Sequence, residues 1–245
     1  MALIQMDYMA ESIQRWTTSW VYLPFDETDA KTEPGAVVLL HGYGGNHTDW
    51  LVHTTLCRTA RALNLALVMP DGDNSFYLDH PARSEDYEAY IGQELPRLMQ
   101  KAFSIAGNPE NTFIMGVSMG AFGALRIGAK YGNVYRKAAG LSTPLAPFGK
   151  GRAGGHVDVL AGGPGGDSML DALGRALSQK QAVAEMYVAV GAEDPLLADN
   201  RCLERFLLRN NVPHAYREVP GCRDAFEFLE SESRKALLWM TSKEA

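Results

Sequence analysis

The fold is indicated most directly by residues 112–130, which read TFIMGVSMGAFGALRIGAK. Residues 112–117 form a short apolar run that is typical of a buried strand. The residues after Ser118 are small and helix-forming, so a helix is predicted directly after the turn. Gly116 and Gly120 flank the serine and leave room for a sharp bend of the backbone. The sequence therefore predicts a strand–turn–helix unit with an exposed serine at its turn.

The same alternation of short apolar runs and longer amphipathic stretches continues on both sides of this unit. It predicts an α/β fold with a mostly parallel central sheet and helices on both faces. The predicted strands cover residues 4–9, 16–23, 36–41, 65–70, 111–117, 135–141, 185–190 and 215–219. The predicted helices cover residues 48–62, 86–103, 119–130, 200–209 and 226–240. We expect one domain over residues 1–245, with a small cap or loop insertion at 142–181, because residues 149–166 are very rich in glycine.

The composition is that of an ordinary globular protein, with 46% hydrophobic and 21% charged residues. The chain carries 23 Lys and Arg against 29 Asp and Glu, which gives a formal net charge of −6. A protein with this net negative charge lacks the basic surface of a nucleic-acid-binding protein. It would not be attracted to an anionic membrane either. We therefore expect a small-molecule substrate as the partner, neither nucleic acid nor membrane, and we leave a homo-oligomer open.

The N-terminal residues and the cysteines bear on the compartment. Asp7 and Glu11 interrupt the first residues, so no secretory signal is expected there. Three cysteines without CxxC spacing fit a reducing compartment, and we predict a cytoplasmic location. No metal-binding motif is present, and we expect neither a metal nor another cofactor.

Ser118 is the predicted nucleophile, because residues 116–120 match the pattern GxSxG between a strand and a helix. The helix that follows points its N-terminus at the serine, where free N–H groups favour developing negative charge. The alternative interpretation is a glycine-rich turn with an incidental serine.

A second glycine-rich segment, residues 39–45 (LLHGYGG), follows another buried strand. In acyl transfer, the tetrahedral intermediate needs two N–H donors about 3 Å from its oxyanion. We assign these donors to the backbone N–H groups of Met119 and Tyr43. A phosphate-binding loop is disfavoured because GxxxxGK[ST] and GxGxxG are absent. Gly42 and Gly44 let the backbone approach a substrate, and His41 is expected to be a structural residue near the pocket.

Three segments together resemble the esterase D group of α/β-hydrolases, which includes S-formylglutathione hydrolases, tributyrin-type acetylesterases and some feruloyl esterases. Besides the serine motif, they are residues 41–50 (HGYGGNHTDW), 69–77 (MPDGDNSFY) and 190–196 (VGAEDPL). The resemblance covers roughly residues 3–240. It implies an α/β-hydrolase fold, no cofactor and a Ser–Asp–His triad that cleaves short acyl esters or thioesters. Ser118 then matches the nucleophile and Asp194 the acid, while Phe76 and Tyr77 match the substrate pocket.

The chain departs from this family pattern where the triad histidine belongs. Residues 220–226 read PGCRDAF, and Arg223 occupies the histidine position without any gap. An arginine stays protonated and has no acceptor atom, so it cannot take the proton of the serine. A base at another position remains open, with four candidate histidines: His47, His53, His80 and His156.

Two hypotheses follow from this departure. The first is a serine esterase that acts through an acyl-enzyme on Ser118, with its base at an unusual position. The second is a catalytically impaired relative that binds a ligand, because the guanidinium of Arg223 could hold a carboxylate or a phosphate. An acyltransferase is a weaker third reading, since it needs the same base.

Overall fold

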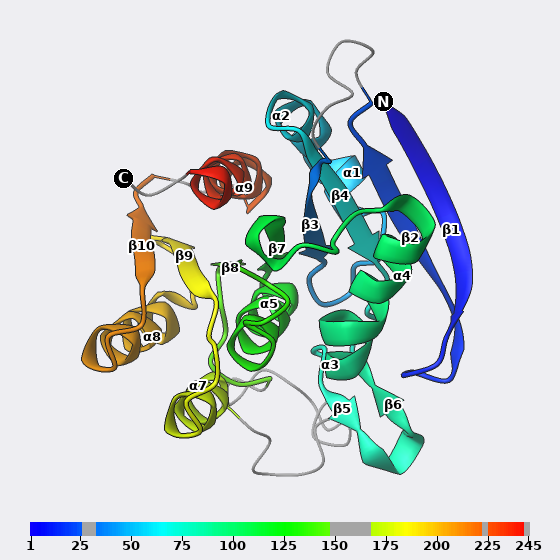
Figure 1. Cartoon of the computed structure of the whole chain (residues 1–245). Coiled ribbons are helices and arrows are strands. Elements are labelled where there is room, and N and C mark those ends of the chain that lie inside the picture. Colours follow the sequence, from blue (N-terminus) through cyan, green and yellow to red (C-terminus); the bar gives the residue numbers. More distant parts are fainter. Residues whose placement is uncertain (26–32, 148–167, 222–224, 243–245) are drawn as a thin grey trace.

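The structure is a computed structural model that describes residues 1–25, 33–147, 168–221 and 225–242. Its centre is an eight-stranded sheet with the strand order β1-β2-β4-β3-β7-β8-β9-β10 (Figure 1). The strands are β1 (Ala2–Ala10), β2 (Arg15–Leu23), β3 (Gly35–Leu40), β4 (Leu65–Pro70), β7 (Thr112–Val117), β8 (Lys137–Leu141), β9 (Glu185–Gly191) and β10 (His214–Val219). The pairs from β4 to β10 are parallel, and β2 runs antiparallel to both of its neighbours. The predicted mostly parallel α/β architecture is confirmed.

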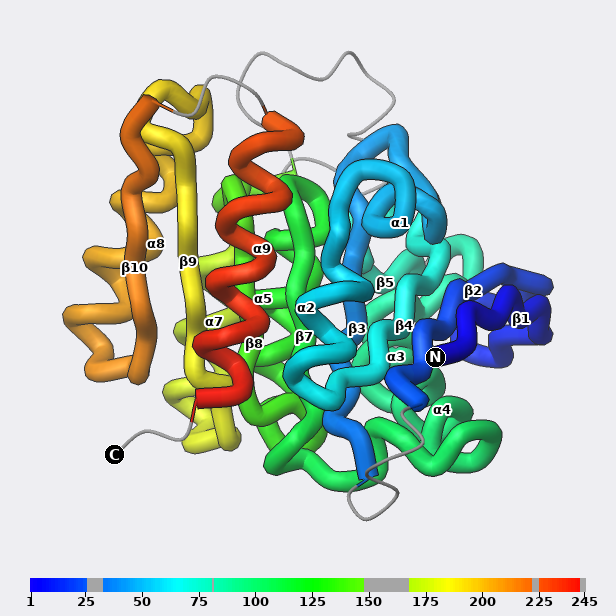
Figure 2. Tube along the Cα trace, turned by 90° about the horizontal axis from the view of Figure 1, so that it is seen from above, coloured from blue at the N-terminus to red at the C-terminus, as the bar shows by residue number. Residues whose placement is uncertain are grey.

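Helices cover both faces of this sheet (Figures 1 and 2). One face carries α1 (Asp49–His53), α2 (Leu56–Ala62) and α9 (Ala225–Thr241). The other carries α3 (Tyr87–Ala89), a π-helical turn (Tyr90–Glu94), α4 (Leu95–Phe103), α5 (Met119–Lys130), α7 (Met169–Ser178) and α8 (Leu197–Arg209). Short 3-10 turns lie at Pro81–Arg83 and Pro109–Asn111.

The central strands β3 and β4 are apolar at every position because both of their faces are covered. In β3, Ala36, Val38 and Leu40 enter the core on one side of the sheet. Val37 and Leu39 enter the core on the other side, as the two-residue period of a strand requires. All residues of β3, β4 and β9 are buried. The sheet is therefore a rigid platform, and the carboxyl ends of its parallel strands meet at one edge, where α/β proteins bind their ligands.

Two helix predictions need correction, and one small hairpin was missed. The helix predicted over 48–62 is two helices, because Thr54 between them is extended, with φ −139° and ψ 163°. The helix predicted over 86–103 is helical from Tyr87 to Phe103 and contains the π-helical turn, whereas Asp86 belongs to a short strand. A small hairpin of β5 (Asp79–His80) and β6 (Glu85–Asp86) precedes it and was not predicted.

Part of the predicted insertion at 142–181 lies outside the described residues, at 148–167. The described part contains α7, whose Leu173 is fully buried and which packs against α5. In the chain, α7 lies between β8 and β9, and it belongs to the layer of helices on one face of the sheet. A cap over the site remains a prediction.

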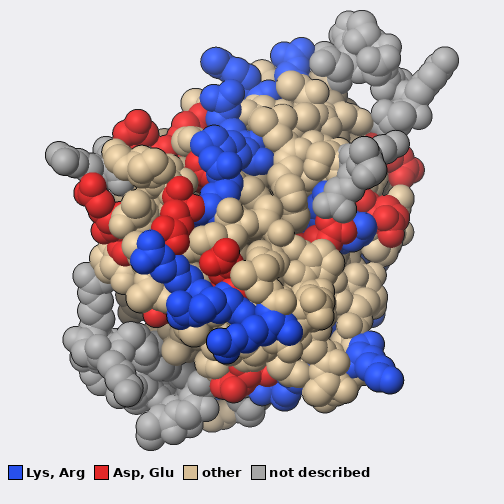
Figure 3. All heavy atoms as spheres, turned by 90° about the vertical axis from the view of Figure 1, so that its left-hand side faces the viewer, with Lys and Arg blue, Asp and Glu red and all other residues tan. Residues whose placement is uncertain are grey.

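The two edges of the sheet differ in character. β10 carries charged residues, and Glu218 there forms an ion pair with Arg201 of α8. Figure 3 shows Lys, Arg, Asp and Glu side chains intermixed on this side of the molecule. No helix among the described residues is long and apolar enough to cross a membrane.

Candidate active site

Ser118 lies at the junction between β7 and α5, at the carboxyl edge of the sheet. Its backbone has φ 53° and ψ −115°, a conformation that side-chain-bearing residues rarely adopt. The backbone N–H of Ser118 donates to the carbonyl of Leu141 at 2.9 Å, and its carbonyl accepts from the N–H of Phe122 at 3.0 Å. These bonds hold the strained turn in place. Such strain costs about 1–3 kcal/mol and is concentrated at functional sites.

Close backbone packing explains why glycine occurs two residues before and two residues after the serine. A Cβ atom on Gly120 would lie 2.2 Å from the carbonyl oxygen of Leu40 and 2.7 Å from that of His41. A Cβ atom on Gly116 would lie 2.1 Å from the carbonyl oxygen of Gly120. The first turn of α5 can therefore lie directly against the ends of β3 and β7. Its N–H groups, which have no partner within the helix, start beside the serine.

The loop after β3 forms a turn next to this junction. The N–H of Gly45 donates to the carbonyl of Gly42 at 3.1 Å, and Gly44 has the positive φ of 79° that suits the third position of a type II turn. The N–H of Gly44 is taken by the side chain of Asn74 at 2.7 Å. The Tyr43 N–H has no acceptor within the part of the chain that the structure describes. A Cβ on Gly42 would lie 3.8 Å from the Cβ of Ser118, which places the turn against the serine.

His41 supports this turn from below. Its side chain is fully buried, its Nδ1 is 2.8 Å from the Gly42 carbonyl, and its Nε2 accepts from the N–H of Gly72 at 2.9 Å. Both ring nitrogens are thus occupied by backbone groups. The hydroxyl of Tyr77 donates to the carbonyl of His41 at 3.3 Å.

The two aromatic residues assigned to the pocket differ in their surroundings. Tyr77 is 1% exposed and packs beneath the loop. Phe76 is 9% exposed, and its ring lies 5.9 Å from that of Tyr43, which is 53% exposed. Phe76 and Tyr43 thus form the aromatic rim of the turn, whereas Tyr77 fills the space under it.

Asp194 follows β9 at the same edge of the sheet. Its Oδ1 accepts from the N–H of Leu196 at 2.7 Å, and its Oδ2 accepts from the hydroxyl of Ser142 at 2.7 Å. Ser142 directly follows β8, the strand between those of Ser118 and Asp194, and it has a φ of 55°. Sequence reasoning missed Ser142, because the LST sequence around it has no recognisable motif.

Arg223, the predicted occupant of the histidine position, lies outside the described residues, as does His156. The flanking elements are described: β10 ends at Val219 and α9 begins at Ala225. α9 is fixed to the segment between α1 and α2, because the carboxylate of Glu230 in α9 accepts from the N–H and the hydroxyl of Thr55.

The described histidines have other contacts. His47 Nδ1 lies 3.0 Å from the Asp71 carboxylate, and His53 stacks on Phe226 with 4.4 Å between ring centroids. His80 is buried, and burial together with the charge of Arg83 lowers its pKa. Among the described residues, no histidine forms a hydrogen bond with Ser118 or Asp194. The part of the chain that the structure describes therefore brings no histidine to the serine as a replacement base.

A cavity of about 410 Å³ opens beside the Gly44–Asn46 part of the turn. Polar side chains line it, among them Asp71, Asn74 and Tyr87. Burial by itself would raise the pKa of Asp71, but the neighbouring His41 and His47 side chains outweigh it and lower that pKa. The carboxylate therefore stays ionised at neutral pH and fixes the loop after β4.

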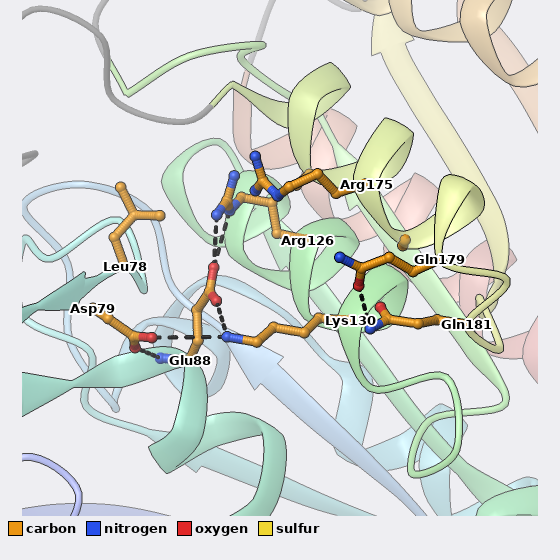
Figure 4. Close-up of a pocket in the computed structure, with 10 residues that line it drawn as sticks. Leu78, Asp79, Glu88, Arg126, Lys130, Arg175, Gln179 and Gln181 are labelled. Atoms are coloured by element: carbon orange, nitrogen blue, oxygen red, sulfur yellow. Dashed lines mark hydrogen bonds and ion pairs between the residues drawn. The ribbon is translucent and has the colours of Figure 1, made fainter.

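A second cavity, of about 380 Å³, lies between α5, α7 and the β5–β6 hairpin (Figure 4). Glu88 accepts from Arg126 at 2.8 and 3.1 Å and from Lys130 at 2.6 Å. Burial would raise the pKa of Glu88, but the two cations outweigh it and lower the pKa. Lys130 is twelve residues beyond Ser118, about 18 Å along the helix. This cavity is thus remote from the serine, and its ion pairs join α3 to α5.

The geometry agrees with comparisons against known proteins. A protein-family model described as "Putative esterase" matches residues 10–230. The chain belongs to this esterase family. It is 31% identical to an acetyl esterase of Caldicellulosiruptor saccharolyticus, over 98% of both chains.

Two solved structures from Staphylococcus aureus share the fold of this esterase-family chain. The fluorophosphonate-binding serine hydrolase FphF has a TM-score of 0.89 at 24% identity, over 99% of both chains. The S-formylglutathione hydrolase FrmB has a TM-score of 0.87 at 24% identity, over 98% of this chain and 99% of that one. The predicted α/β-hydrolase fold and the resemblance to the esterase D group are confirmed.

Proposed function

We propose that the protein is a serine carboxylesterase that hydrolyses short acyl esters or thioesters through an acyl-enzyme on Ser118. One observation carries this proposal: Ser118 has the strained backbone of a nucleophile at a strand–helix junction, and glycine makes that junction possible. A purely structural turn would gain nothing from this strain. The acetyl esterase relative makes acetyl esters the first substrates to test.

The surrounding amides suit the first chemical step. The Ser118 hydroxyl attacks the acyl carbon, and the carbonyl oxygen becomes an oxyanion. The donors that stabilise it are the N–H of Met119, at the start of α5, and the N–H of Tyr43, which has no acceptor among the described residues. One such donor contributes about 2.7–4 kcal/mol of transition-state stabilisation. The alcohol or thiol then leaves, and water releases the acid.

The position of the aromatic rim gives the substrate its orientation. Phe76 and Tyr43 provide an apolar surface for a short acyl chain. The polar cavity of about 410 Å³ opens beside the Gly44–Asn46 part of the same turn, and it suits the leaving group. A small neutral ester would thus lie across the turn, with its carbonyl at the two amides.

The proton of Ser118 needs an acceptor, and Asp194 is the residue that would orient one. Ser142 holds one oxygen of this carboxylate, and each carboxylate oxygen can accept a further hydrogen bond. Arg223 can pair with Asp194 but cannot accept a proton. We therefore propose reduced turnover. A site that lacks one triad member retains about 10³–10⁴-fold catalysis over water through the oxyanion hole and binding.

A second function is favoured by Arg223 itself. A guanidinium at the histidine position, near the serine and the amide donors, would make the site a binding pocket for a carboxylate or a phosphate. In this case the native chain binds acetate or inorganic phosphate without turnover, and Arg223→Ala weakens that binding. Unchanged affinity in Arg223→Ala would exclude this role.

Hydrolysis of p-nitrophenyl acetate and butyrate by three proteins distinguishes the two functions. They are the native chain, Ser118→Ala and Arg223→His. An active native chain and an inactive Ser118→Ala variant support the esterase. If the native chain does not hydrolyse either ester but the Arg223→His variant does, the result supports the ligand-binding function. Equal rates in all three proteins would contradict both.

A further inference from the structure

The strand β1 is an open edge of the sheet. It lies at the end of the sheet opposite to β10 (Figures 1 and 2), and among the described residues it pairs only with β2. Natural edge strands are commonly protected by lysine, proline, bulges or short length. β1 is nine residues long, contains no lysine, arginine or proline, and pairs with β2 in unbroken register. Its single charge is Asp7. The opposite edge, β10, is shorter and carries Arg217 and Glu218.

One face of this edge is apolar and exposed. The odd-numbered residues of β1 point outward, whereas the even-numbered ones point toward the core. Leu3 is 50% exposed and Met9 is 47% exposed, and Trp16, the β2 neighbour of Met9, is 72% exposed. The helices on this face of the sheet pack on more central strands, since α2 contacts β4. The outer face of β1 thus presents apolar side chains beside an unpaired strand edge.

We propose that β1 pairs antiparallel with β1 of a second copy of this chain, about a twofold axis at Met6. In this register Leu3 faces Met9 of the partner subunit, and Met9 faces the partner's Leu3. Gln5 faces the partner's Asp7, so an amide donor meets a carboxylate. Each row continues into β2, where Trp16 lies beside Met9 and Tyr22 beside Leu3. Two apolar rows then cross the junction, with two polar rows between them.

The neighbouring registers are less favourable. A shift by two residues in one direction places Asp7 opposite the partner's Asp7, and like charges directly opposite each other are destabilising. The same shift in the other direction places Leu3 opposite the partner's Asp7. A shift by one residue pairs odd-numbered residues of one copy with even-numbered residues of the other. The outer face of one copy would then continue into the inner face of the other. The sequence of β1 is therefore self-complementary in one register, which favours a second copy over an unrelated strand as the occupant.

The mass of the native chain in solution is the first test. Sedimentation equilibrium at micromolar concentrations should give twice the 26.8 kDa of one chain. The double variant Leu3→Glu with Met9→Glu places like charges opposite each other, and it should weaken association more than about tenfold. Leu208→Glu makes a similar change at an exposed leucine of α8 and should leave the dimer intact. A monomeric native chain, or a Leu3→Glu/Met9→Glu variant as dimeric as the native chain, would overturn the proposal.

A second variant tests the register. Leu3→Glu with Met9→Lys places opposite charges face to face in the proposed pairing. It should therefore associate more strongly than Leu3→Glu with Met9→Glu, although both variants lose the same apolar side chains. Equal association of the two double variants would show that positions 3 and 9 do not face each other. Far-ultraviolet circular dichroism and thermal unfolding of each variant establish that it is folded.

Discussion

The substitution Gly120→Ala tests the close packing that shapes the nucleophile turn. The added methyl group would lie 2.2 Å from the carbonyl oxygen of Leu40 and 2.6 Å from its carbonyl carbon. Reaching a tolerable 3.0 Å from the oxygen requires α5 and β3 to separate by about 0.8 Å. Neither element can yield easily, because both are buried backbone in the centre of the sheet. Overpacking of a tight core costs about 1–3 kcal/mol. We expect the upper end, about 3 kcal/mol, which lowers Tm by about 6–12 °C in a domain of this size.

Gly174→Ala is the matched control, because the same methyl group enters open space. At Gly174, within α7, the nearest atom to the new Cβ is Phe206 Cζ at 4.0 Å. Alanine is a better helix former than glycine by about 1 kcal/mol, so this variant should be slightly more stable than the native chain. Urea and thermal unfolding followed by circular dichroism measure both. Gly120→Ala with the stability of the native chain would refute the packing argument.

Three further predictions concern the ion pairs and the acid. Glu88→Gln should cost about 3 kcal/mol, because it removes the buried carboxylate that accepts from Arg126 and Lys130; urea unfolding measures it. The lowered pKa of Glu88 means that this contribution is full above the ordinary value of 4.5 and is lost as the pH falls through the folded pKa. The stability gap between the native chain and Glu88→Gln should therefore narrow below about pH 4, and a constant gap would contradict the assignment. In the Arg223→His variant, where Asp194 has a base to orient, adding Ser142→Ala should lower kcat for p-nitrophenyl acetate about tenfold with little change in KM, as the loss of about 1.4 kcal/mol of orientation implies; an unchanged kcat would show that Asp194 needs no such support.

Local patterns were sufficient for the elements whose structure is decided locally. The apolar run Leu65–Pro70 and the small-residue run Met119–Lys130 were predicted with the bounds that the structure has. The break at Thr54 was not predicted, because its cause lies far away in the chain. Thr55 is held by Glu230, 175 residues later, and no window of local sequence contains that contact. The β5–β6 hairpin has only two paired residues on each strand, too few for a period to appear.

The candidate site likewise contains residues that local sequence could identify and one that it could not. The sequence was sufficient to propose Ser118, Tyr43 and Met119, because the spacing of the neighbouring glycines indicates where the backbone turns sharply. Ser142 could not be identified in this way, because its role depends on β8 lying between β7 and β9 in the sheet. A serine after a strand carries no signal of its own. The assignments of Ser118 and Asp194, and the place of Arg223 beside them, stay predictions that chemistry must test.

Intact-protein mass spectrometry after mixing with p-nitrophenyl acetate tests the central claim, that Ser118 is an activated nucleophile. We predict one acetyl group on the native chain, located by peptide mapping to Ser118, and none on Ser118→Ala. Arg223→His should release the acetyl group faster, because a histidine supplies the base for the attacking water. Absence of acetylation from the native chain, or equal acetylation of the native chain and Ser118→Ala, would contradict the account.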